Sequence, residues 1–95
     1  MTQSLAGKIA LVTGSTGGIG KAIAEGYAAA GAKVWVHGRN AEAGEQIAAA
    51  IGGRFFRADL AEADQVTALA QAVLDAEDGL DILVNNAGIV IIMPL

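Results

Sequence analysis

Three glycines stand at spacings that suit the binding of a phosphate group. Gly14, Gly18 and Gly20 fall between an apolar run of strand length and a stretch of helical period. In such a turn one missing side chain permits the tight bend, another lets a pyrophosphate approach the backbone, and a third lets helix and strand pack closely. The free N–H groups at the start of the helix then face the anion. The order of strand, turn and helix therefore favours a phosphate-binding turn over a purely structural one.

Two other chemical motifs fit the same turn less well. Gly20-Lys21 matches the centre of a mononucleotide P-loop, but the full pattern requires Gly in place of Ser15 and Ser or Thr in place of Ala22. A nucleophile elbow requires Gly two residues before its serine, where this chain has Thr13. We therefore expect Ser15 to act within the loop rather than as a nucleophile.

The elements that must position this turn follow from the apolar pattern. Apolar runs of strand length alternate with longer stretches of helical period, which predicts an α/β fold with a parallel sheet. The expected strands are Ile9–Val12, Lys33–His37, Arg54–Arg57 and Asp81–Val84. Right-handed crossovers place these strands in the order 3-2-1-4, a Rossmann-like doubly wound sheet that is truncated after the fourth strand. Ligands bind such a sheet outside the carboxyl ends of its strands, where the order reverses.

Composition limits the possible classes of protein. The 95 residues, 54% of them hydrophobic, suffice for one small domain with a core. The 10 acidic and 6 basic residues, without a basic run, argue against nucleic acid as a partner. No cysteine and a single histidine predict no metal site. The apolar run Ile89–Leu95 is far shorter than the roughly 20 residues that span a bilayer, so no membrane segment is expected. Met1–Ser4 does not look like the start of a signal peptide, so a cytoplasmic protein is expected.

Three motifs together resemble one known family. Thr13–Gly20 reads T-G-S-T-G-G-I-G and is similar to the T-G-x-x-x-G-I-G turn of the short-chain dehydrogenase/reductase family. Asp59-Leu60, after the third strand, and Asn85–Gly88, after the fourth, resemble the D-L and N-N-A-G elements of that family. The matches occur in order and span essentially the whole chain.

The resemblance implies which residues surround a dinucleotide cofactor. The pyrophosphate would be lined by the turn, the adenine amino group would donate to Asp59, and the segment after the fourth strand would border the adenosine. The residues concerned are Gly14, Gly18, Ile19, Gly20, Asp59, Leu60, Asn86, Ala87 and Gly88.

The end of the second strand indicates NADP rather than NAD. Dinucleotide folds that select NAD usually carry there an acid that binds the ribose hydroxyls and repels a 2′-phosphate. In this chain Gly38 stands at that position and Arg39 follows, so the repulsion is absent and a guanidinium fork suited to phosphate is present. Ser15 and Thr16 are expected to donate further hydrogen bonds from across the turn, and Asn40, a good N-cap for the helix that follows, completes the predicted cofactor loop.

The resemblance also implies which residues are missing. Members of the family use a Tyr-x-x-x-Lys pair with a Ser and an Asn, whereas the only tyrosine here, Tyr27, is followed by Gly31 at the lysine position. We therefore expect no catalytic residue in residues 1–95, which would be a partial NAD(P)-binding domain without its catalytic half. The parent would be an oxidoreductase, a homo-oligomer at full length, that moves hydride between a nicotinamide cofactor and a ketone or secondary alcohol, such as a 3-oxoacyl thioester or a sugar. A non-catalytic nucleotide-binding module and an inactive truncation remain the alternatives.

The remaining notable residues are interpreted as structural. Trp35 and Tyr27 follow the apolar pattern of their elements, and His37 is a lone histidine at a strand end. The isolated chain is expected to self-associate, because the fourth strand would have no partner on its outer edge and only one helix would cover one face of the sheet.

Overall fold

The computed structural model describes residues 4–86 and 89–92 of the chain. The elements are β1 Ile9–Val12, α1 Gly18–Ala29, β2 Lys33–Gly38, α2 Ala41–Ile51, β3 Arg54–Arg57, α3 Ala63–Ala76, β4 Ile82–Asn85 and β5 Ile89–Ile92. The sheet has the order β3-β2-β1-β4-β5, and its first four strands run parallel. The predicted order 3-2-1-4 is thereby confirmed.

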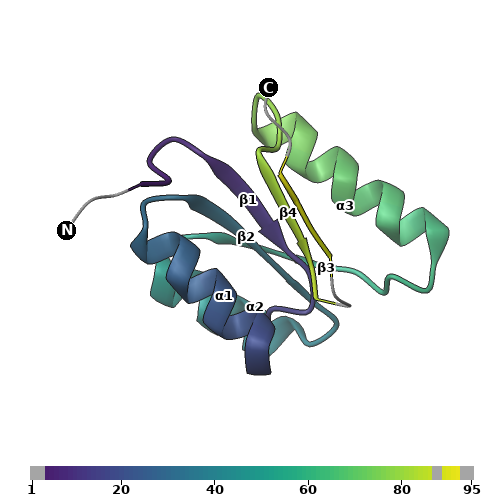
Figure 1. The fold of residues 1–95 in the computed structure, drawn as a ribbon. Helices are drawn as coiled ribbons and strands as arrows, with labels where there is room; N and C mark the ends of the chain where they lie inside the picture. The colour runs from purple at the N-terminus through teal and green to yellow at the C-terminus, as the bar shows by residue number, and fades with distance from the viewer. Residues whose placement is uncertain (1–3, 87–88, 93–95) are drawn as a thin grey trace.

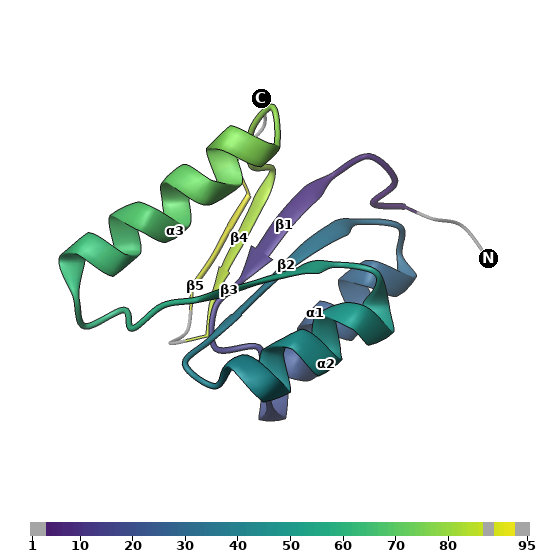
Figure 2. The same ribbon diagram turned by 180° about the vertical axis from the view of Figure 1, so that it is seen from behind.

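The sheet lies between two helical layers, with α1 and α2 on one face and α3 on the other (Figure 1, Figure 2). Strands that are buried on both faces need apolar side chains at consecutive positions. In β2, Val34 and Val36 pack into the cluster below α1 and α2, whereas Trp35 packs into the cluster below α3. The run Val34-Trp35-Val36 therefore joins the two halves of the core.

A fifth strand corrects the expectation that the sheet ends at the fourth. β5 pairs with β4 in antiparallel register, with Asn85 opposite Ile89 and Ile82 opposite Ile92, so the outer edge of β4 is covered. Antiparallel neighbours need only a short connection, whereas a further parallel strand would need a crossover of a dozen residues or more. The sequence of β5 consists of β-branched residues, which favour a strand directly after this short connection.

The start of β4 is fixed by an aspartate. The N–H of Ile9 donates to Oδ2 of Asp81 at 2.8 Å, and the N–H of Asp81 donates to the Ile9 carbonyl at 3.0 Å. These bonds hold Asp81 beside the start of β1, and the strand itself begins at Ile82, one residue later than predicted. The two central strands are thereby aligned from their amino ends.

The apolar face of α3 is only partly covered. Leu69 and Val73 are buried, but Val66 and Leu74 are 41% and 56% exposed. They line an apolar groove of about 650 Å³ that also contacts Leu83 of β4. The helix therefore packs on the sheet through only part of its apolar face.

Candidate cofactor-binding site

A cleft of about 450 Å³ opens at the carboxyl ends of the parallel strands. Its lining comes from the last residues of β2 and β4 and from the loops that follow β1, β2, β3 and β4. The residues are Thr13, Gly14, Thr16, His37, Gly38, Arg39, Ala58, Asp59, Leu60, Ala61, Asn85 and Asn86. This edge contains the point between β1 and β4 where the strand order reverses, which is where doubly wound sheets bind ligands. The structure therefore brings Gly14, Thr16, Arg39, Asp59 and Asn86 together as predicted.

The turn after β1 presents backbone rather than side chains to the cleft. Gly14 has φ +61° and Gly18 has φ +57°, a left-handed conformation that favours glycine. A Cβ on Gly20 would overlap the Gly14 carbonyl oxygen, so the first turn of α1 packs directly on the loop. No described side chain caps α1 and its first turn has no acid, so its N–H groups are suited to bind an anion.

Ile19 and Gly18 belong to this helix start rather than to the cleft wall. Ile19 is 74% exposed, which is unusual for a large apolar side chain. Its position beside free helix N–H groups suits contact with a bound ligand.

Ser15 corrects part of the prediction for this turn. Its side chain is fully buried, and its Oγ lies 2.7 Å from the Val12 carbonyl while accepting the N–H of His37 at 2.9 Å. The hydroxyl therefore fastens the turn to the ends of β1 and β2 instead of facing a ligand. The side chain of Thr16 does line the cleft.

The end of β4 is joined to the turn by side-chain hydrogen bonds, in addition to the backbone bond from the Thr13 N–H to the Val84 carbonyl at 2.9 Å. Thr13 Oγ1 donates to the Val84 carbonyl at 3.2 Å and accepts the N–H of Asn86 at 3.1 Å. The Asn86 side-chain amide donates to the Gly14 carbonyl at 3.2 Å. Asn86 thus orients the turn as well as bordering the cleft, whereas the predicted contacts Ala87 and Gly88 lie outside the described residues.

The last residue of β2 has no room for a side chain. A Cβ on Gly38 would overlap the Cγ2 methyl of Thr16. Arg39 follows, exposed at the cleft, and its carbonyl accepts the Nε–H of Arg57 at 2.9 Å. Asn40 accepts the N–H of Ala43 and caps α2 as predicted, but it does not line the cleft.

The loop after β3 presents a carboxylate. Asp59 is half-buried, its Oδ1 accepts the N–H of Ala61 at 3.0 Å, and its own N–H donates to Gln65 at 2.7 Å. These bonds hold the loop by its backbone. Leu60 is 42% exposed and lines the cleft beside Asp59, as predicted.

His37 was interpreted as a structural residue, and the structure shows what it holds. The ring is only 4% exposed at the end of β2, and its Nδ1 accepts the N–H of Gly14 at 3.0 Å. Its Nε2 lies 2.8 Å from the Ala58 carbonyl. The sequence signal for this role was the place of His37 at the carboxyl end of a strand, next to the cofactor loop.

A charged cluster lies toward the other end of the sheet. Glu77 follows α3, has a side chain only 6% exposed, and accepts hydrogen bonds from Lys33 at 3.1 Å and from the Trp35 indole at 2.9 Å. Burial raises the pKa of the Glu77 carboxyl, but those hydrogen bonds and the charges of Lys33 and Arg54 outweigh it, so this pKa lies below its ordinary value of 4.5. Trp35 is buried as predicted, and Arg54 stacks 5.7 Å from its ring centre.

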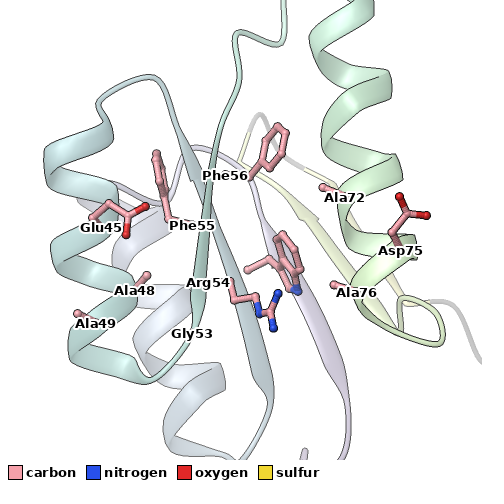
Figure 3. A pocket seen from close by; sticks show the side chains of 11 residues that line it. Glu45, Ala48, Ala49, Gly53, Arg54, Phe55, Phe56, Ala72, Asp75 and Ala76 are labelled. Atoms are coloured by element: carbon pink, nitrogen blue, oxygen red, sulfur yellow. The ribbon is translucent and has the colours of Figure 1, made fainter.

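A larger hollow of about 720 Å³ lies beside this cluster along β3, the strand at the edge of the sheet. Figure 3 shows Phe55 and Phe56 extending from β3 to opposite sides, toward α2 and α3. The hollow begins at Gly53 and Arg54, at the amino end of β3, away from the edge where such sheets bind ligands. Volume alone therefore does not make it the candidate site.

Among residues 4–86 and 89–92 no three His, Cys, Asp or Glu side chains are grouped so that they could hold a metal ion. No helix within those same ranges is long and apolar enough to cross a membrane.

Comparison with known proteins places this cleft in context. The family model described as short chain dehydrogenase matches residues 8–95. The chain is 46% identical over 95 residues to D-threitol dehydrogenase of Mycolicibacterium smegmatis, covering 95% of this chain and 36% of that protein. It is 43% identical over 95 residues to the NADP-dependent (R)-specific alcohol dehydrogenase of Lentilactobacillus kefiri, covering 96% of this chain and 38% of that protein.

A solved structure agrees with the sequence matches. The Pseudomonas aeruginosa RhlG/NADP active-site complex superposes with a TM-score of 0.84 at 45% identity, over 92% of this chain and 36% of the other. The chain thus spans little more than a third of the length of these proteins. With motifs, fold and cleft in agreement, the chain belongs to the short-chain dehydrogenase family.

Proposed function

We propose that the chain forms the adenine-nucleotide part of the cofactor site in an NADP(H)-dependent oxidoreductase. When bound, the reduced cofactor would give a hydride to a ketone, or the oxidised cofactor would take one from a secondary alcohol. The names of the two dehydrogenases reported above, and of the NADP complex, support this class of reaction and cofactor. The groups that exchange a proton with the substrate would come from residues outside these 95, so that residues 1–95 form a partial domain.

The turn after β1 fits a pyrophosphate. Gly14 and Gly20 lie so close that side chains are excluded between them, and Asn86 packs on the same backbone. The helix start beside them lacks an acid that would repel an anion. Backbone N–H groups there would bind the phosphates, with the apolar side chain of Ile19 beside them.

One observation carries the preference for a 2′-phosphate. Gly38 presents no carboxylate and has no space for one against Thr16, while the next residue, Arg39, reaches the cleft with its charge exposed. An acid that would bind ribose hydroxyls and repel phosphate is thus excluded sterically as well as by sequence. The guanidinium of Arg39 and the hydroxyl of Thr16 would bind the 2′-phosphate.

The opposite wall of the cleft fits an adenine ring. Asp59 is held by its backbone and by one carboxylate oxygen, which leaves the second oxygen for the adenine amino group. Leu60 offers an apolar surface beside it, and Asn86 borders the adenosine from β4.

The experiment compares two ligands that differ only in the 2′-phosphate. We would titrate the chain with 2′,5′-ADP and with 5′-AMP by isothermal calorimetry, using wild type, Arg39→Ala, Arg39→Lys and Lys8→Ala. Hydrogen bonds of charged groups contribute on the order of 1.5–3 kcal/mol, so Arg39→Ala should weaken 2′,5′-ADP roughly 10- to 100-fold and barely change 5′-AMP. Arg39→Lys should give an affinity for 2′,5′-ADP between those of the wild type and Arg39→Ala, because lysine keeps the positive charge but cannot donate two parallel hydrogen bonds as a guanidinium does.

Lys8→Ala is the matched control, since it removes an exposed positive charge next to the amino end of β1. It should leave both affinities unchanged at moderate salt. Equal affinity of the wild type for the two ligands, or equal weakening of both by Arg39→Ala, would show that Arg39 does not bind a 2′-phosphate.

A further inference from the structure

The imidazole of His37 joins two loops that are far apart in the sequence. Its Nδ1 accepts the N–H of Gly14, in the turn after β1, at 3.0 Å. Its Nε2 lies 2.8 Å from the carbonyl of Ala58, which directly precedes Asp59. These are the loops that the proposed function assigns to the pyrophosphate and to the adenine.

The bond from Gly14 decides which ring nitrogen carries the proton. A backbone N–H can only donate, so Nδ1 must present its lone pair. The proton of the neutral ring therefore resides on Nε2, from which it donates to the Ala58 carbonyl. Both ring nitrogens then have a hydrogen-bond partner in a residue that is only 4% exposed. The ring therefore links the backbones of Gly14 and Ala58 at a fixed distance.

The main chain around His37 supports the same two loops. The N–H of Ser15 donates to the His37 carbonyl at 2.8 Å, and the N–H of Ala58 donates to the Gly38 carbonyl at 3.2 Å. Any residue at position 37 would keep these bonds. The ring adds one bond on each side, to Gly14 and to Ala58, and only a side chain with an acceptor and a donor at that separation makes both.

We propose that His37 is a positioning residue of the nucleotide site, which sets the spacing between the phosphate-facing turn and the adenine-facing loop. The proposal rests on the proposed function for what the two loops bind. Without the Ala58 bond, the loop that carries Asp59 keeps only its backbone bond from Ala58 to Gly38 of β2, and without the Gly14 bond the turn loses the acceptor for one of its N–H groups.

Two substitutions separate the two bonds. The amide of asparagine reaches the position of Nδ1, so His37→Asn keeps an acceptor for Gly14 and loses the link to Ala58. The longer side chain of glutamine reaches the position of Nε2, so His37→Gln keeps a donor for Ala58 and loses the acceptor for Gly14. Val34→Ala is the control, because it weakens the same strand at a buried position that does not line the cleft.

The measurement uses ADP and IDP, which differ at the amino group that Asp59 is proposed to bind. The ratio of their dissociation constants reports adenine recognition, and the affinity for both reports phosphate binding. His37→Asn should reduce the preference for ADP about 3- to 10-fold, the usual range for one hydrogen bond. His37→Gln should weaken both ligands by a similar factor and keep their ratio, whereas Val34→Ala should lower the melting temperature without changing the ratio.

Two spectroscopic measurements test the hydrogen bonds from the His37 ring to Gly14 and Ala58 without any ligand. The ¹⁵N chemical shifts of the His37 ring should show a protonated Nε2 and an unprotonated Nδ1. Exchange of the Gly14 amide hydrogen should be faster in His37→Gln than in His37→Asn. A ring protonated on Nδ1 instead of Nε2 would overturn the proposal. It would also be overturned if His37→Asn and His37→Gln changed the ADP and IDP affinities only as much as Val34→Ala does at the same loss of stability. A wild-type chain that binds neither ADP nor IDP would contradict the proposed function instead. The ring chemical shifts and the amide exchange would then be the only test of the hydrogen bonds from the His37 ring to Gly14 and Ala58.

Discussion

Gly38 and Thr16 both line the cleft and lie so close together that a Cβ on Gly38 would overlap the Thr16 methyl group. Gly38 is the last residue of β2, whereas Thr16 lies in the turn after β1. Cofactor preference and packing are therefore coupled at this position.

A side chain at position 38 should destabilise the protein unless Thr16 becomes smaller. Gly38→Ala forces the Thr16 side chain to move, and overpacking of this kind typically costs about 1–3 kcal/mol. Thr16→Ser removes the methyl group, so the double variant Thr16→Ser/Gly38→Ala should recover most of the loss. Urea unfolding of the two single variants and the double variant measures the coupling. Additive effects would show that the two side chains do not collide.

The same contact affects how a change of cofactor preference must be tested. Gly38→Asp introduces both a carboxylate and the steric overlap, so alone it should weaken NADPH and NADH in a protein of this family that carries this chain. In the Thr16→Ser background the overlap is relieved, and Gly38→Asp should weaken NADPH while sparing NADH, because the acid repels the 2′-phosphate. Titrations of both cofactors against both backgrounds check this. A uniform loss in the Thr16→Ser background would contradict it.

Removing the Glu77 carboxylate should lower stability in a pH-dependent way. The pKa of Glu77 is below its ordinary value of 4.5 in the fold, so its contribution is complete above the unfolded pKa and is lost as the pH falls through the folded pKa. Glu77→Gln should cost about 1–2 kcal/mol at pH 7, since it loses charged hydrogen bonds to Trp35 and Lys33. The difference from wild type should shrink as the pH is lowered below 4.5.

Unfolding curves between pH 7 and pH 3 measure this difference. Glu45→Gln is the control, because Glu45 is exposed on α2, and it should change stability by less than about 0.5 kcal/mol. A Glu77→Gln deficit that stays constant over the whole range would argue that the charge of Glu77 does not stabilise the fold.

The 95-residue chain should self-associate through the groove beside α3. Val66 and Leu74 are large, exposed and apolar, and they line that groove with buried Leu69 and Val73. Exposed apolar patches of this kind drive association. Val66→Gln/Leu74→Gln should therefore lower the weight-average mass in sedimentation velocity. Ile19→Gln, which removes an even more exposed apolar group elsewhere, should leave the mass unchanged. A Val66→Gln/Leu74→Gln variant that associates like the wild type would exclude the groove as the contact.

The chain by itself should not turn over an alcohol or ketone with either nicotinamide cofactor. Proton transfer needs a positioned acid or base beside the reacting carbon. Tyr27 is half-buried on α1 and packs against the apolar core, so it does not provide that group. Absorbance at 340 nm with a panel of ketones and secondary alcohols, compared with a full-length relative, tests this. Turnover that co-purifies with the chain and disappears in Arg39→Ala would show that catalytic groups are present.

The sequence alone determined the local elements and the type of site. Apolar runs such as Val34-Trp35-Val36 indicate buried strands, and the glycines at 14, 18 and 20 indicate the tight turn before the first helix, because burial and backbone conformation depend on the residue types themselves. Parallel strands with right-handed crossovers allow few orders, so the order of the first four strands followed as well. Asp59 and Asn86 were placed by motifs whose positions relative to those strands are regular.

Only the tertiary structure decided which side chains are free to bind a ligand. Ser15 and Thr16 are neighbours with similar hydroxyls, yet Ser15 is buried against β1 and β2 while Thr16 lines the cleft. The role of His37 depends on Gly14 and Ala58, which are 23 and 21 residues away in the sequence. The pairing of β5 with β4 depends likewise on partners in space. Hydrogen bonds and close packing of this kind are set by distances between backbones that meet only after folding, so no pattern along the chain records them.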